Sequence, residues 1–250
     1  RPLSAEASPP RGRVRGRAAV SVVAPGAGTN TNCEVYMELA RASELEVNVV
    51  GKSQAAYDRY PESWQGGAPS PNLETFAREI RAKGLADWSD CLVFGSRGGQ
   101  VVLPSLWRQR GADVPPAIVI NGGCAAALPS GAAWPDGAVT FLLVGGKDYF
   151  NSGLAADAYT ADLQRHVPRN NCTTAILYVE EMTHLPQGSL LKAALLPAIR
   201  AMLRWKASPA DVPDLELGLV VDAVRRGGWS GRLLHTRRGG VWQTVRFGGR

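Results

Sequence analysis

Three polar residues of types that cooperate in nucleophilic catalysis each follow an apolar run of the sequence. They are Ser96, Asp148 and His184, in that order along the chain. A serine hydroxyl becomes a nucleophile when an imidazole removes its proton, and a carboxylate orients that imidazole. Few residues can act as the general base, because the chain has 3 histidines. The other two, His166 and His235, fall in a predicted helix and in the C-terminal tail.

The surroundings of Ser96 are typical of a sharp turn between a strand and a helix. The stretch "CLVFGSRGGQ" (91–100) places glycines before and after the serine. Such a turn exposes the hydroxyl, and small neighbours let the strand and the helix approach closely. The backbone N–H of Arg97 would then point at the oxygen that becomes negative when a carbonyl is attacked. The structural alternative is an ordinary turn serine between two packed elements.

Asp148 and His184 occupy equivalent places after two later apolar runs. Asp148 follows a Gly-Gly turn in "TFLLVGGKDYF", and His184 follows a long apolar run in "AILYVEEMTHLPQG". Taken singly, each residue has a structural alternative, which is a turn or helix-capping aspartate and a surface or core histidine. Taken together with Ser96, they predict a Ser-His-Asp triad, because ligands of open α/β sheets bind beyond the carboxyl ends of the strands.

The elements that must position these residues alternate along the chain. Strands are predicted at 18–26, 45–51, 90–95, 116–122, 138–146 and 172–180, and helices at 33–43, 70–84, 98–111, 152–167 and 189–206. Nearly continuous apolar strands separated by helices are typical of a parallel sheet that is covered on both faces. The sequence therefore predicts an α/β fold with a mainly parallel, doubly wound sheet.

Both ends of the chain are basic. The first 17 residues carry five arginines and one glutamate, and residues 225–250 carry seven arginines and no acid. Because the net charge of the whole chain is +6, the stretch between the ends is net acidic. Such a distribution is typical of a body with cationic tails rather than of a nucleic-acid-binding domain with a basic face.

The changes in composition predict three parts. They are a flexible basic segment at 1–17, a main domain at 18–206 and a basic appendage at 207–250. The appendage begins with a linker and ends in two alternating apolar segments around an Arg-Gly-Gly turn, which predicts a β-hairpin. An isolated hairpin is marginally stable, so we expect Trp229, Trp242 and Val245 to lose exposure by packing on the main domain.

Composition excludes several classes of protein. Hydrophobic residues make up 45% and charged residues 20% of the chain, and no apolar run approaches the length of a membrane-spanning helix. The 4 cysteines form no CxxC pair, so we expect buried free thiols. We expect a soluble protein of a reducing compartment, in the cytoplasm or in an organelle after removal of a transit peptide. No metal or cofactor is predicted, since the "GAG" after the first strand lacks the third glycine of a dinucleotide loop.

Four short stretches together resemble the α/β-hydrolase superfamily. "FGSRGG" resembles its nucleophile elbow, "LLVGGKD" its acid turn, "EEMTHLP" its histidine loop and "VVAPGAGTN" its oxyanion loop. The resemblance covers about residues 18–206 and is closest to small hydrolases of the dienelactone-hydrolase or serine-esterase kind, without a cap domain. It implies that Ser96 attacks an acyl group and that the amides of Ala27 and Arg97, with Gly26 and Gly28 shaping the loop, bind the oxyanion.

Two further functions remain open at this stage. Phe94 stands two residues before the serine, where the superfamily usually has glycine. The chain could therefore be a catalytically weak or inactive member that acts as a binding or assembly subunit. The arginines of the tail, interleaved with aromatic residues, could also contact an anionic partner, either a nucleic acid or a membrane surface. The substrate expected of the enzyme is a small acyl compound, namely a carboxylic ester, a thioester or a related molecule.

Overall fold

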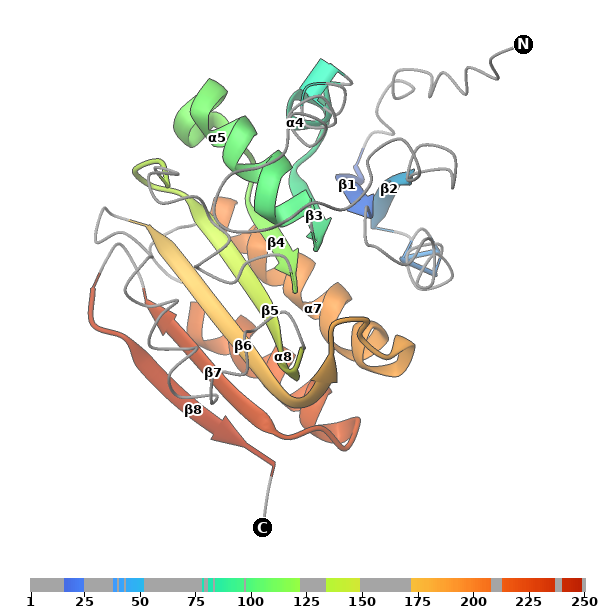
Figure 1. The fold of residues 1–250 in the computed structure, drawn as a ribbon, viewed down its shortest axis with the longest axis vertical. Helices are drawn as coiled ribbons and strands as arrows, with labels where there is room; N and C mark the ends of the chain where they lie inside the picture. The colour runs from blue at the N-terminus through green and yellow to red at the C-terminus, as the bar shows by residue number, and fades with distance from the viewer. Residues whose placement is uncertain are drawn as a thin grey trace.

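An eight-stranded sheet runs through the part of the chain that the computed structural model describes (Figure 1). That part consists of residues 16–24, 38–39, 41–42, 44–51, 78, 81–82, 84–96, 98–121, 134–148, 172–207, 213–236 and 240–248. The strands are β1 (Ala18–Ala24), β2 (Leu45–Gly51), β3 (Cys91–Gly95), β4 (Ala117–Ile120), β5 (Val139–Lys147), β6 (Thr173–Thr183), β7 (Gly231–Thr236) and β8 (Gln243–Phe247). Their order across the sheet is β2-β1-β3-β4-β5-β6-β7-β8.

The first six strands are parallel and the last two are antiparallel. Each neighbouring pair from β2 to β6 runs in the same direction, whereas β7 pairs antiparallel with both β6 and β8. The parallel strands all point their carboxyl ends to one edge, which is where residues that follow them gather. Six segments predicted as strands from their apolar runs are strands here, and the predicted hairpin is present as β7 and β8.

Helices cover both faces of the sheet. The helices α4 (Leu85–Trp88) and α5 (Leu103–Arg110), with a π-helical turn at Gly98–Val102, pack on one face. The helices α7 (Gly188–Ala207) and α8 (Pro213–Arg226) pack on the other and lie behind the strands in Figure 1. The predicted fold class, a mainly parallel α/β sheet with helices on both faces and a C-terminal hairpin, is therefore confirmed.

Alternation along the strands fills the two layers of the core. Successive side chains of a strand point to opposite faces. In β3, Val93 packs in the layer under α7 and α8, whereas Leu92 and Phe94 pack in the layer under α5. Both faces are buried, so the strand shows a continuous apolar run rather than alternation, as parallel strands do.

The cysteines of the described residues are buried free thiols. Cys91 and Cys172 are both unpaired and fully buried, in agreement with the sequence prediction. Burial raises the pKa of the Cys91 thiol to about 12 and also raises that of Cys172, because a thiolate loses its hydration there. Both therefore remain neutral at physiological pH.

The helix α8 is an element that the sequence analysis did not predict. Its segment "PDLELGLVVDAVRR" begins with proline and repeats apolar residues at helical spacing. Leu217, Val220 and Val224 are buried, and α8 packs against α7. The segment between the predicted linker and the hairpin is thus part of the helical layer behind the sheet. The division of the chain at residue 207 stays a prediction.

The hairpin packs less completely than expected. Trp229 and Trp242 are half-buried against the two core layers, as expected of a hairpin that packs on the main domain. Val245 keeps 47% of its surface exposed, so its expected burial was wrong. The reason is its position on β8, which is the edge strand and is covered by no described helix on that face.

Several sequence expectations fall outside the described residues. The helix expected at 152–167 lies wholly outside them, and those expected at 33–43 and 70–84 lie mostly outside. So do the basic segment expected at 1–17, nearly all of it, and the stretch between β4 and β5 where a cap domain was expected to be absent.

Candidate active site

Ser96 lies at the tip of β3 in a conformation that non-glycine residues rarely adopt. Its φ is 41°, in the left-handed region. The backbone N–H of Ser96 donates to the carbonyl of Ile120 at 2.9 Å, and the serine carbonyl accepts from Gly99 at 3.0 Å. These two bonds tie the turn to β4 on one side and to the following helical turn on the other. The side chain is half-buried.

The chain accommodates Phe94 by having a glycine at position 98. Phe94 is fully buried in the core layer under α5. A Cβ at position 98 would lie 3.3 Å from the phenyl Cδ1 and 3.3 Å from the Val23 carbonyl oxygen. Gly98 therefore lets the helical turn approach the ring, which is buried in the core. A Cβ added at Gly95 would meet no described atom within 4 Å, so packing does not require a glycine there.

The structure brings Ser96, His184 and Asp148 into one hydrogen-bonded row. The serine Oγ lies 3.1 Å from His184 Nε2. The imidazole Nδ1 lies 3.0 Å from each carboxylate oxygen of Asp148. His184 is 4% and Asp148 is 6% exposed, so both are shielded from water. An ionised carboxylate only accepts hydrogen bonds, so Nδ1 carries the proton and Nε2 is free to accept one from the serine hydroxyl.

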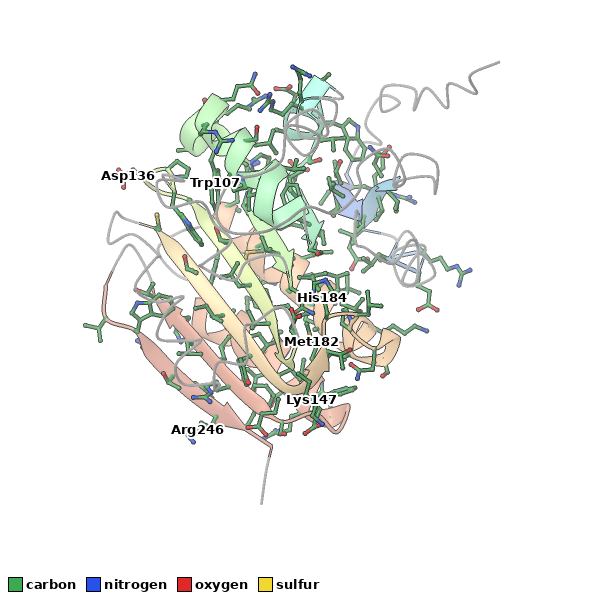
Figure 2. All side chains as sticks on the ribbon, viewed as in Figure 1. Trp107, Asp136, Lys147, Met182, His184 and Arg246 are labelled. Carbon is green, nitrogen blue, oxygen red and sulfur yellow. The ribbon has the colours of Figure 1, made fainter. Side chains whose placement is uncertain are left out.

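A local irregularity between β5 and β6 brings the acid and the base together. Gly145 pairs with Val179 and Lys147 pairs with Thr183, so two steps along β5 match four along β6. A Cβ on Gly145 would lie 2.4 Å from the Met182 carbonyl oxygen. The bulging part of β6 thus passes directly over glycine backbone. Figure 2 shows Lys147, Met182 and His184 along the same edge of the sheet.

Gly146, the second glycine of the acid turn, also lies too close to the backbone of β6 to carry a Cβ. A Cβ on Gly146 would lie 2.5 Å from both the Glu180 carbonyl oxygen and the Tyr178 hydroxyl oxygen. Immediately after this glycine pair, the Asp148 N–H donates to the Gly145 carbonyl at 3.2 Å. The "GGKD" stretch therefore forms a compact turn that delivers the carboxylate beside the imidazole.

Asn121 is a buried polar residue of the site that the sequence analysis missed. It follows β4, has a φ of 46° and is 7% exposed. Its side chain contacts the backbone of the acid turn and of the histidine turn. The available signal was an Asn-Gly pair after a strand, in "PAIVING", which is equally typical of an ordinary turn.

The predicted oxyanion residues lie outside the described residues. This holds for the loop of Gly26, Ala27 and Gly28, and for Arg97 after the serine. Their amides as oxyanion donors therefore stay a prediction.

Two of the described arginines of the tail make local contacts. Arg225 pairs with Asp222 at 2.9 Å, and the Arg232 guanidinium lies 5.3 Å from the centre of the Tyr178 ring. An anionic partner at the tail stays a prediction. None of the helices within the described ranges has the length and apolar character needed to cross a membrane.

No protein-family model and no curated protein matches the chain. Among solved structures, a predicted CIB-like hydrolase from Thermoplasma acidophilum is 14% identical, with 77% of this chain and 87% of that chain covered and a TM-score of 0.47. The RedJ thioesterase of the prodiginine biosynthetic pathway in Streptomyces coelicolor is 14% identical, with 83% and 96% covered and a TM-score of 0.44. The chemistry open to this site follows from the side-chain geometry of the chain itself.

Proposed function

We propose that the protein is a serine hydrolase that cleaves a carboxylic ester, a thioester or a related acyl compound. One observation carries the proposal, namely the row in which Ser96 Oγ contacts His184 Nε2 and His184 Nδ1 contacts Asp148. Each contact has the length and the polarity that proton transfer from serine to imidazole requires. The left-handed φ of Ser96 adds support, since strained residues cluster at sites of chemistry.

The first half of the reaction forms an acyl-enzyme. Ser96 Oγ attacks the carbonyl carbon, its proton passes to His184 Nε2, and the carbonyl oxygen becomes an oxyanion. Asp148 holds Nδ1–H and stabilises the imidazolium that forms. When the oxyanion collapses, the bond to the leaving alcohol or thiol breaks, and the proton on Nε2 passes to that leaving group.

The second half regenerates the enzyme. A water molecule takes the place of the leaving group and gives one proton to His184 Nε2 as its oxygen attacks the acyl carbon. Collapse of the second oxyanion breaks the bond to Ser96 Oγ, which regains its proton from the imidazolium. The products are a carboxylic acid and an alcohol or a thiol, and no cofactor enters the balance.

The oxyanion donors in this proposal are the backbone amides of Ala27 and Arg97. Arg97 directly follows the nucleophile in the sequence and precedes the helical turn at Gly98–Val102, and the first N–H groups of a helix have no partner within the helix. Ala27 follows β1 by three positions in the sequence, and β1 is the strand beside β3 in the sheet. Removal of one such donor typically lowers kcat by about 10²–10³-fold.

A fluorophosphonate probe tests the proposal directly. We expect the probe to add its phosphonyl group to Ser96 in the wild type and in Ser230→Ala, a control that removes a half-buried serine hydroxyl that donates to Glu180 and not to His184. Ser96→Ala and His184→Ala should give no labelling, and their kcat on a panel of activated acyl esters and thioesters should fall by at least about 10³-fold.

The same experiment separates the enzyme from a binding or assembly subunit. A folded wild-type protein that neither labels nor turns over any member of the panel would refute the hydrolase and leave the non-catalytic role. Labelling of Ser96→Ala would place the nucleophile elsewhere in the chain.

A further inference from the structure

Two consecutive residues at the carboxyl end of β4, the last residue of the strand and the one that follows it, contact all three segments of the proposed triad. The Ile120 carbonyl accepts the backbone N–H of Ser96 at 2.9 Å. The side chain of the next residue, Asn121, reaches the acid turn and the histidine turn. The nucleophile, the acid and the base come from separate segments of the chain, and this dipeptide is a point at which the three are bonded to one another.

The amide of Asn121 uses both of its N–H donors and its acceptor oxygen. Its Nδ2 group donates to the Thr183 carbonyl at 2.8 Å and to the His184 carbonyl at 2.9 Å. Its Oδ1 accepts the backbone N–H of Gly145 at 2.8 Å. Two carbonyl acceptors on one side and an N–H donor on the other fix the orientation of the amide, because the flipped group would oppose like partners.

The backbone at position 121 suits asparagine for a second reason. Its φ of 46° lies in the left-handed region, which only glycine, asparagine and aspartate adopt with ease. Among these three residue types, only asparagine carries two N–H donors and an acceptor on a short side chain. Both the conformation and the contacts of the site therefore select this residue type.

We propose that Asn121 is a positioning residue, which fixes the backbone of residues 183 and 184 relative to β5 so that the imidazole meets both Ser96 and Asp148. Within the histidine turn, the Thr183 hydroxyl donates to the Leu185 carbonyl at 2.7 Å, and this bond does not link the turn to the acid. Beside the pairing of Lys147 with Thr183, the Asn121 amide adds a side-chain link to the acid turn, through Gly145 and the bond from Asp148 N–H to the Gly145 carbonyl.

The expected signature of positioning is a loss in kcat with little change in KM. The role rests on the proposed hydrolase function, in which the imidazole must move a proton in each half of the reaction. A displacement of about 1 Å at a reacting group lowers the rate by about 10²-fold. The described hydrogen bonds of the Asn121 side chain go to the backbone of the acid turn and of the histidine turn and not to the serine hydroxyl, so substrate binding should be spared.

Two variants of Asn121 distinguish the effect of its side-chain amide from the effect of its backbone conformation. Asn121→Asp keeps the shape and the acceptor but turns an oxygen toward two carbonyls. Asn121→Gly keeps the left-handed conformation and removes the amide entirely. Ser89→Ala serves as the matched control, because it also deletes a buried hydrogen bond, the 2.7 Å contact between Ser89 Oγ and Ser21 Oγ, without touching the histidine turn.

We expect Asn121→Gly to lower kcat on an activated acyl ester by about 10²-fold at nearly constant KM, and Ser89→Ala to lower only Tm. If Asn121→Asp does not fold, the kcat of Asn121→Gly alone tests the positioning role. The ¹⁵N shifts of the His184 imidazole give a second readout that needs no activity. In the wild type they should report the Nδ1–H form, and in Asn121→Gly a mixture of tautomers.

The outcomes distinguish this proposal from the proposed function. Wild-type kcat and unchanged imidazole shifts in Asn121→Gly would overturn the positioning role. If the wild type is inactive, the hydrolase proposal fails, and the imidazole shifts alone then decide whether Asn121 orients His184.

Discussion

Ser96 and Asn121 are the two non-glycine residues with positive φ among the described residues, and both lie in the candidate site. A left-handed non-glycine residue costs about 1–2 kcal/mol relative to a relaxed one. Their neighbours hold them there, since the N–H of Ser96 is bonded to Ile120 and the N–H of Asn121 to the Leu143 carbonyl. The strain at Ser96 is offset by the sheet that surrounds it, whereas asparagine adopts the left-handed region with ease.

Comparing two substitutions at Ser96 measures this strain. Ser96→Ala and Ser96→Gly both remove the hydroxyl and its contact with His184, so both should lose turnover. Only glycine relaxes the backbone. We expect the free energy of unfolding of Ser96→Gly to exceed that of Ser96→Ala by about 1 kcal/mol, measured by urea denaturation at constant m. Equal stabilities would show that the turn is unstrained.

The sequence predicted the proposed reacting residues better than the residue that positions them. Ser96, Asp148 and His184 were identified because each combines a reactive residue type with a place after an apolar strand. Asn121 was missed because its side chain contacts backbone atoms of distant segments. Since almost every residue type has the same backbone groups, the sequence does not indicate such partners. The contact exists only once β4, β5 and the histidine turn are side by side.

At the scale of the element, the strands were predictable and their irregularities were not. Continuous apolar runs identify buried parallel strands by composition alone. The bulge of β6 opposite Gly145 depends on the register between two strands, which the pattern of either strand does not contain. The helix α8 is different, since its apolar spacing is visible in the sequence, whereas the proline-rich stretch at its start is typical of a linker.

The close approach at Gly145 gives a prediction for the acid turn. Gly145→Ala would place a Cβ 2.4 Å from the Met182 carbonyl oxygen, so the backbone of β5 or β6 must move. We expect a loss of about 1–3 kcal/mol in the free energy of unfolding, together with a loss of turnover, because Gly145 is bonded to both Asn121 and Asp148.

The helix α8 provides the matched control. A Cβ on Gly218 meets nothing within 4 Å, and the residue is exposed in the middle of a helix. Gly218→Ala should therefore raise the free energy of unfolding by about 0.5–1 kcal/mol without changing kcat. A Gly145→Ala variant with wild-type stability and turnover would contradict the packing described for the bulge.

At the scale of the molecule, the described residues 213–236 and 240–248 continue the main sheet and its helical layer. The helix α8 covers α7, and β7 completes the edge of β6. Burying each apolar side chain of α8 contributes about 1.5–3 kcal/mol. Several such side chains together approach the net stability of a typical domain, about 5–15 kcal/mol.

Truncation tests whether residue 207 is a domain boundary. We expect a chain ending at Ala207 to be insoluble or to melt without cooperativity, since it exposes α7 and the edge of β6. A chain ending at Gly248 should unfold like the full-length protein. Circular dichroism and soluble yield are the measurements. Cooperative unfolding of the shorter chain at the full-length Tm would instead support the division predicted from composition.

The row of hydrogen bonds joins residues that are far apart along the chain. Ser96 and His184 are separated by 88 positions, and His184 and Asp148 by 36. Closing such loops costs entropy before any contact is gained, and parallel pairing is accordingly slow. No partly folded chain that lacks β4, β5 or β6 can assemble the row. The return of the proposed hydrolase activity during refolding should therefore report the last step of sheet assembly. A helical circular dichroism signal that returns earlier carries no information about that step.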